Sequence, residues 1–253
     1  VMLLPFAARL AAFLGRHFSS PEEALGTPRH LDRNILATPD LALNACILEL
    51  GHLGELTRQL CGQALHPDEA DKKGSMAQHQ AVNDLALSVG DFVMRLQRSS
   101  LPGPVAVTLP RSLECMQYFL NAAELAEDVG SKAPQLKALK DASLRQAQTG
   151  FVREIETLIG VADTTSPYLS REALDQHLDG VKAHYDQQKE DLLERALEIS
   201  LSVRSVSDLL EHNSSAKRMA GQFVKGVSTL LDLRETTGMD PAGTVTQAED
   251  MAA

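Results

Sequence analysis

The side chains that could perform chemistry are scattered through the chain. The best-spaced histidines are His177 and His184, seven residues apart in a helical pattern, with Asp175 and Asp179 nearby. Seven residues make about two helical turns, so the two imidazoles could share one helix face and bind a metal ion. A polar, solvent-facing helix surface accounts for the same spacing, and we favour that interpretation.

The three cysteines do not form the pattern of a metal site. Cys46, Cys61 and Cys115 are odd in number and fit no zinc-binding spacing, and each falls in a helical pattern. We expect reduced, buried thiols that act as small apolar side chains in a reducing compartment. The chain also lacks G-x-S-x-G, Walker A and G-x-G-x-x-G motifs. We therefore do not expect an enzyme.

The composition favours an all-α protein. Hydrophobic residues make up 43% of the 253 residues, which is enough for a packed core. Aromatic residues make up only 4% and Trp is absent, whereas strands draw on aromatic and β-branched residues. The formal net charge of −10 repels phosphate backbones, so nucleic acid is not an expected partner.

Apolar residues at three- and four-residue spacing predict six long helices. Thr38 and Pro39 suit the N-cap and the first position of the first helix, and Gly130 suits the C′ position of the third. No Gly or Pro lies between Leu192 and Leu210, so the last two helices could be nearly continuous. The predicted helices cover about residues 38–66, 75–98, 110–129, 134–162, 170–192 and 198–234.

These helices group into two triplets, which define the predicted domains. Two tandem antiparallel three-helix bundles, at residues 38–130 and 131–237, follow an amphipathic connector helix and loop at residues 1–37. Residues 238–253 are small, polar and acidic, and we expect a disordered tail there.

The connector segment Leu3–Phe18 carries an apolar stripe, with Arg9 and Arg16 off that stripe. No stretch of the chain reaches the roughly 18 apolar residues of a membrane span. The stripe has no assigned partner in either triplet, so we expect it to pack on another chain or to lie near a membrane. Its membrane-proximal residues are Leu3, Leu4, Phe6, Leu10 and Leu14.

Three short runs follow the connector: Pro28–Asp32 (PRHLD), Leu36–Pro39 (LATP) and Leu41–Ala45 (LALNA). Together they resemble the opening of the PhoU-like cytoplasmic domain of bacterial sodium/phosphate cotransporters. The resemblance implies a non-catalytic regulatory or structural domain that modulates phosphate uptake through helix-face contacts, at the cytoplasmic face of the bacterial inner membrane. Its expected partner is the membrane transport core, in the same polypeptide, and a homodimer is a further option.

Two alternative functions stay open. One is a free-standing regulator of the same type that negatively controls phosphate uptake. The other is a helical metal-binding protein, because members of this family carry acids four residues apart on the third helix of each repeat. Such a spacing places two carboxylates on one helix face, where they can share a hard cation.

The match to that metal motif is partial. Leu120 and Ser207 stand where the family carries an acid. The resemblance therefore implies only a degenerate site, and we expect no cofactor beyond weak binding of a divalent metal. The residues matched to the motif are Glu124 and Asp128 in the first repeat, and Glu211 and His212 in the second. The first helix of each triplet could lend further carboxylates from Glu49, Glu55, Glu154 and Glu156.

Overall fold

The computed structural model of this chain describes residues 25–67, 72–137, 142–198 and 203–244. Across these ranges the protein is built of long α-helices and one 3-10 helix, and it contains no β-strand. The all-α prediction is confirmed. The connector residues Leu3, Leu4, Phe6, Leu10 and Leu14 lie outside the described ranges.

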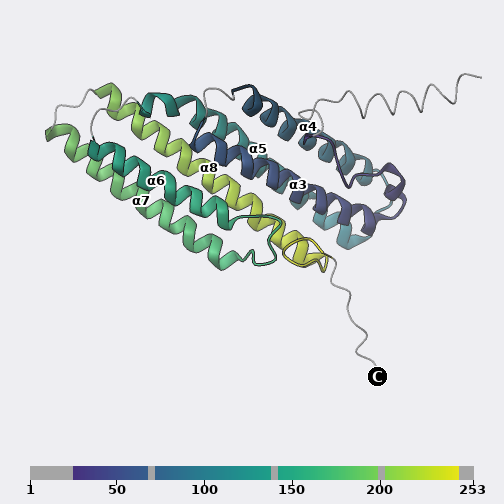
Figure 1. Ribbon diagram of the computed structural model, residues 1–253. Coiled ribbons are helices and arrows are strands. Elements are labelled where there is room, and N and C mark those ends of the chain that lie inside the picture. Colours follow the sequence, from purple (N-terminus) through teal and green to yellow (C-terminus); the bar gives the residue numbers. More distant parts are fainter. Residues whose placement is uncertain (1–24, 68–71, 138–141, 199–202, 245–253) are drawn as a thin grey trace, which may run out of the picture.

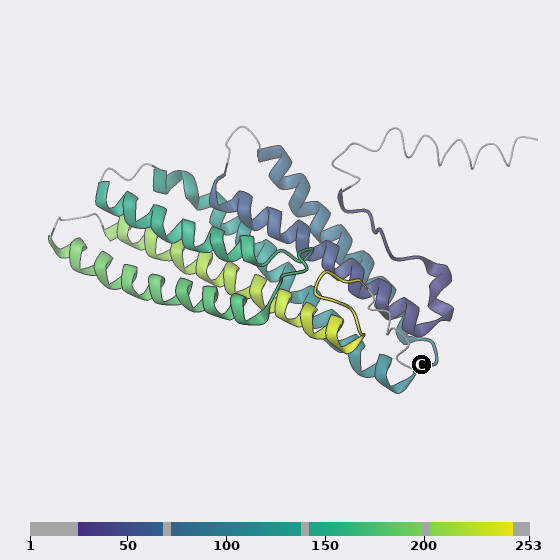
Figure 2. The same ribbon diagram turned by 60° about the horizontal axis from the view of Figure 1, so that its bottom comes forward.

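The long helices lie side by side in one elongated bundle (Figure 1 and Figure 2). The 3-10 helix precedes the first of them and packs against it. The elements in chain order are η1 (Arg33–Ala37), α3 (Pro39–Leu65), α4 (Lys72–Gln97), α5 (Gly103–Lys137), α6 (Ala142–Val161), α7 (Arg171–Glu198) and α8 (Val203–Thr236).

The helices of both predicted triplets share one hydrophobic core. The most extensive helix pair is α5 with α8, and α3 packs on α4, α5 and α8. The ring of Phe119 on α5 is fully buried and lies 5.9 Å from the ring of Phe223 on α8. One continuous cluster of buried residues therefore draws on every long helix. The division into bundles at 38–130 and 131–237 stays a prediction.

Two of the predicted helix starts match the structure. Thr38 is the N-cap of α3 and Pro39 is its first residue, although the Thr38 side chain donates or accepts no capping hydrogen bond. The hydroxyl oxygen of Ser170 accepts a hydrogen bond from the backbone N–H of Ala173 at 3.2 Å, at the start of α7. Local capping chemistry explains why these starts could be read from sequence.

The predicted bounds of the third helix are wrong at both ends. It runs from Gly103 to Lys137, so Gly130 and Pro134 lie inside it. Gly130 faces α3, where a Cβ added to it would lie 3.7 Å from the Cα of Ala64. The glycine thus allows two helices to approach closely instead of ending one. The interior Pro110 and Ala106, the residue four before it, are both exposed, so water can bind the carbonyl that loses its intrahelical donor.

The last two long helices are separate rather than continuous. They pack against each other, and both views show α7 and α8 side by side (Figure 1 and Figure 2). The residues between them, 199–202, lie outside the described ranges. Near this end Leu144, Leu192 and Leu209 form a second, smaller buried cluster. The reversal buries apolar residues of both helices, which one long helix would leave exposed.

The start of the predicted C-terminal tail at Gly238 is too early. The backbone N–H of Met239 donates to the Arg234 carbonyl at 2.8 Å, and the Met239 side chain is only 6% exposed. The buried guanidinium of Arg234 donates to the carbonyls of Thr164 and Pro241. Residues 238–244 are therefore packed against the helices, and 245–253 lie outside the described ranges.

The residues before α3 are held by a buried carboxylate. Glu49 on α3 is fully buried and accepts hydrogen bonds from the backbone N–H groups of Arg29 at 2.8 Å and His30 at 2.7 Å. Its other oxygen lies 2.8 Å from Nδ1 of His52. Leu31 and Ile35 pack against the core beside this site. We call Glu49, His52 and the two backbone donors the Glu49 clasp.

Candidate functional site

The structure brings two of the motif-matched acids together, but around a lysine. The ammonium of Lys132 lies 2.8 Å from a carboxylate oxygen of Asp128 on α5 and 2.8 Å from one of Glu211 on α8. Burial opposes ionisation of Asp128, yet hydrogen bonds from Lys132 and Ser215 outweigh it and lower the pKa of Asp128. In this structure the ammonium of Lys132, a side chain of the protein itself, is the cation between the carboxylates of Asp128 and Glu211.

His212, the histidine matched to the motif, does not join this ion pair. Its side chain points into the protein interior. His212 is 2% exposed, and its Nδ1 lies 3.4 Å from Nε2 of Gln148 and 3.3 Å from Oδ1 of Asn213. The side chain of Asn213 donates to Gln188 at 2.8 Å. Burial lowers the pKa of His212, so the neutral imidazole is favoured. These residues form a polar cluster among α6, α7 and α8.

The remaining motif residue stands apart. Glu124 is exposed and makes no hydrogen bond or ion pair with the described part of the chain. Of the four acids that could have been lent to the site, Glu49 belongs to the clasp, Glu55 binds Arg58, and Glu156 lies 2.5 Å from Nε2 of His66. Within the described ranges no three His, Cys, Asp or Glu side chains converge to hold a metal ion. Metal binding by Glu124, Asp128, Glu211 and His212 stays a prediction.

We expect that Glu124→Gln leaves the melting temperature unchanged and that the protein purified without added metal holds no stoichiometric iron, zinc or magnesium. An exposed carboxylate without partners contributes little to folding. Elemental analysis and thermal melting of both forms check this, with Asp128→Asn as the matched variant that does lose ion-pair contacts. A stoichiometric transition metal that disappears in Glu124→Gln would establish the metal-binding alternative.

The cysteines and His184 lie in packed surroundings. Cys46, Cys61 and Cys115 are fully buried, and burial raises the pKa of Cys46 and of Cys61 to about 12 and that of Cys115 further still. Such thiols stay protonated and unreactive at neutral pH. His184 packs edge-on against the ring of Phe151, 5.7 Å between centroids, and within the described ranges neither His177 nor His184 belongs to a group of three convergent metal ligands.

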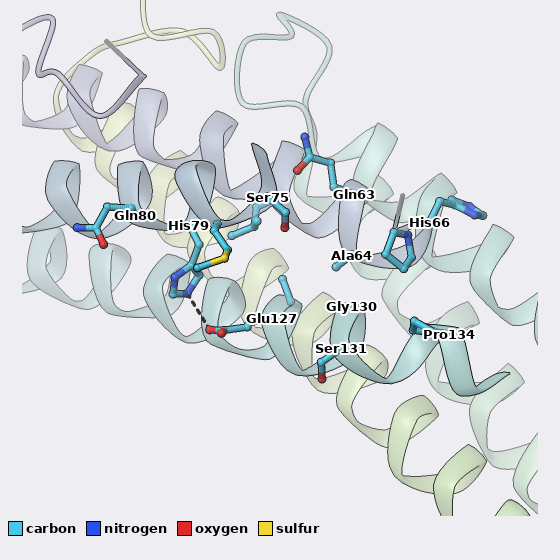
Figure 3. A pocket seen from close by; sticks show the side chains of 14 residues that line it. Gln63, Ala64, His66, Ser75, His79, Gln80, Glu127, Gly130, Ser131 and Pro134 are labelled. Carbon is cyan, nitrogen blue, oxygen red and sulfur yellow. Dashed lines mark ion pairs between the residues drawn. The ribbon is translucent and has the colours of Figure 1, made fainter. Parts of the chain in front are cut away.

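A groove with a volume of about 560 Å³ lies between α3, α4 and α5 (Figure 3). Most of its lining surface is apolar. Small residues form part of its wall, and Met76 of α4 stands at its lip with 74% of the residue exposed. The residues that line it are Leu60, Gln63, Ala64, His66, Pro67, Ser75, Met76, His79, Gln80, Ala126, Glu127, Gly130, Ser131 and Pro134. We call this feature the α3–α4–α5 groove.

Polar side chains mark the rim of the groove. Nε2 of His79 lies 3.6 Å from a carboxylate oxygen of Glu127, and Figure 3 shows this pair reaching across from α4 to α5. That distance is an ion-pair contact and exceeds a hydrogen bond, so Nε2 of His79 has no hydrogen-bond partner in the described structure. An apolar lining with a few polar groups is the usual character of a binding site.

Sequence reasoning did not find this groove. Two residues carry a signal for it in the sequence: Met76, an apolar residue on the polar side of its helix, and Gly130, whose type also suits a helix end. Both become informative only when α3, α4 and α5 are placed together, because the groove is made by three helices and by none of them alone. The membrane-proximal residues Leu3, Leu4, Phe6, Leu10 and Leu14 lie outside the described ranges.

Comparisons with known proteins add no relative. No protein-family model, no curated protein and no solved structure matches this chain. Among the helices that the structure describes, none has both the length and the hydropathy needed to span a bilayer. The groove and its lining residues are therefore the features from which a function can be inferred.

Proposed function

We propose that this chain is a non-catalytic regulatory or structural domain that acts by binding a partner helix in the α3–α4–α5 groove. The groove carries the proposal, because it is a concave, mainly apolar surface of about 560 Å³ in the described ranges. Its walls are rigid helices that belong to the shared core. A surface of this kind suits recognition of an amphipathic helix, whose apolar residues at i, i+3, i+4 and i+7 insert into a groove.

The chemistry at the groove favours binding over catalysis. Its titratable side chains are His66, His79 and Glu127, and none lies within hydrogen-bond distance of a Ser, Thr or Cys nucleophile of the groove. His66 is engaged by Glu156, and His79 by Glu127. These pairs fix the rim and provide polar contacts for a ligand that enters between them.

The proposed partner is the membrane transport core of a sodium-dependent phosphate transporter. Support for this partner comes from the runs Pro28–Asp32, Leu36–Pro39 and Leu41–Ala45, which resemble the opening of the PhoU-like domain. The domain would then sit at the cytoplasmic face of the bacterial inner membrane and change phosphate uptake through its groove. A free-standing regulator of the same process is the alternative, and in-frame membrane spans upstream in the gene distinguish the two.

We expect that Met76→Glu changes sodium-dependent phosphate uptake in the same direction as deletion of the whole domain. A carboxylate at the groove's lip opposes docking of an apolar helix face. Labelled phosphate uptake in cells that express the full gene is the measurement. The matched control is Val107→Glu, because Val107 is 75% exposed, as Met76 is 74% exposed, and does not line the groove. Unchanged uptake after deletion of the whole domain would refute a role in phosphate transport.

A further inference from the structure

The first described residues of the chain lie against α4, which forms one wall of the groove. Gly26 lies against α4, where a Cβ added to it would be 2.9 Å from the carbonyl oxygen of Ala81. Gln80, the residue before Ala81, lines the groove, and so does His79. Residues 1–24, which the structure does not describe, are therefore joined to the rest of the chain at α4, one of the three helices that form the α3–α4–α5 groove.

The tether is long enough for the amphipathic segment to reach the groove. Six residues, 19–24, separate Leu3–Phe18 from Leu25. An extended chain covers up to about 3.5 Å per residue, which gives about 20 Å of reach. A helix formed by Leu3–Phe18 would be about 24 Å long at 1.5 Å per residue. The groove's lining on α5 runs from Ala126 to Pro134, a rise of about 12 Å, so such a helix can cover it.

The apolar spacing and the positive charge of the segment complement the groove. Leu3, Ala7, Leu10 and Leu14 follow the i, i+4, i+7, i+11 spacing of a helix that inserts into a groove. Residues 3–18 contain Arg9 and Arg16 but no Asp or Glu. The rim offers the carboxylate of Glu127, with 72% of its side chain exposed, so opposite charges meet.

We propose that the apolar stripe of Leu3–Leu14 occupies the α3–α4–α5 groove of its own chain, so that a partner helix must displace it. The inference rests on the proposed function in taking this groove as the helix-docking surface. A short tether gives a millimolar effective concentration, so even a weak intramolecular contact fills the groove most of the time. A partner helix then binds only if its affinity and concentration are high enough to displace the segment from the groove.

Thiol labelling of the full chain tests this occupancy. Met76→Cys places a thiol at the lip of the groove, and the native cysteines give little background because all three are fully buried. We expect slow alkylation of Met76→Cys, and an increase of about tenfold when Leu10→Asp is added, as for a groove covered more than nine-tenths of the time. The matched thiol is Val107→Cys, which lies outside the groove and is equally exposed, and Leu10→Asp should leave its rate unchanged.

Each other outcome overturns the proposal. Equal alkylation rates of Met76→Cys with and without Leu10→Asp would mean that the segment does not cover the groove. Protection that weakens on dilution would mean that a second copy of the chain supplies the covering helix. Neither result bears on phosphate uptake, and unchanged uptake after deletion of the domain would leave the labelling result standing. The two proposals therefore fail by separate measurements.

Discussion

Phe119→Ala is expected to lower the free energy of unfolding by about 3–5 kcal/mol, the usual cost of truncating a buried Phe to Ala. Phe119 is fully buried in the interface between α5 and α8, the most extensive helix pair of the protein. Its ring lies against two glycines, since a Cβ on Gly226 would be 2.7 Å from the ring and a Cβ on Gly54 would be 2.9 Å from it. The surrounding helices are therefore fitted to this ring, and truncation leaves a cavity that they cannot easily fill.

Thermal and urea unfolding of the purified chain measure this effect. For a chain of this size, a loss of 3–5 kcal/mol corresponds to a fall in melting temperature on the order of 10 °C. Tyr168→Ala is the matched control, because it removes an aromatic ring that is 90% exposed, and it should leave the melting temperature nearly unchanged. Similar melting temperatures for Phe119→Ala and Tyr168→Ala would show that α5 and α8 do not pack around this ring.

The glycines beside Phe119 extend the same argument. Gly226→Ala should destabilise the protein despite the better helix propensity of Ala, because the added methyl group meets the ring. Combining it with Phe119→Leu, which removes part of the ring's volume, should recover some of the loss. A double-mutant cycle then reports the coupling between α5 and α8 directly.

The sequence predicted the fold wherever a local signal decided the structure. Thr38 and Pro39 marked the start of α3 because capping and proline chemistry act within one helical turn. The periodicity of apolar residues is also a local signal, and it predicted six helices. Gly130 and Pro134 were misread because the sequence does not show what each residue faces. Gly130 lies against Ala64 of another helix, and only the packed structure shows that contact.

The candidate site was harder to predict, because it depends on contacts between distant parts of the chain. Spacing paired Asp128 with Glu124 and Glu211 with His212, whereas the structure joins Asp128 to Glu211 through Lys132. The lysine itself carried no signal, since a cation one turn from an acid is common on helix surfaces. The groove required three helices, and its most exposed apolar residue, Met76, looked like an ordinary surface position.

The residues that carry the family resemblance have structural roles here. Arg29 and His30 donate their backbone N–H groups to Glu49, and Leu31 and Leu36 pack against the core. These residues thus secure the start of α3 in this structure.

Disrupting the Glu49 clasp is the second change that we expect to lower the free energy of unfolding strongly. Glu49→Ala removes the acceptor of two backbone N–H groups and of the His52 ring, and it should lower the free energy of unfolding by about 3 kcal/mol. Urea unfolding at neutral pH measures this loss. Glu49→Gln should cost less, because its amide oxygen can still accept from the backbone. If Glu49→Ala were as stable as the parent chain, residues 25–37 would not depend on the clasp.

The clasp should also make stability depend on pH. Burial opposes ionisation of Glu49, but hydrogen bonds from His52, His30 and Arg29 outweigh it and lower the pKa of Glu49 below the ordinary 4.5. A carboxyl whose pKa is lower in the folded state contributes stability above its unfolded pKa and loses it as the pH falls through the folded value. The stability difference between the parent chain and Glu49→Gln should therefore be constant near neutral pH and shrink below about pH 4.5. Gln does not titrate, so Glu49→Gln removes this component while Asp128 and Asp163, whose pKa values are also lowered, titrate alike in both proteins. A difference that stays constant from neutral pH down to acid unfolding would mean that the charge of Glu49 does not stabilise the clasp.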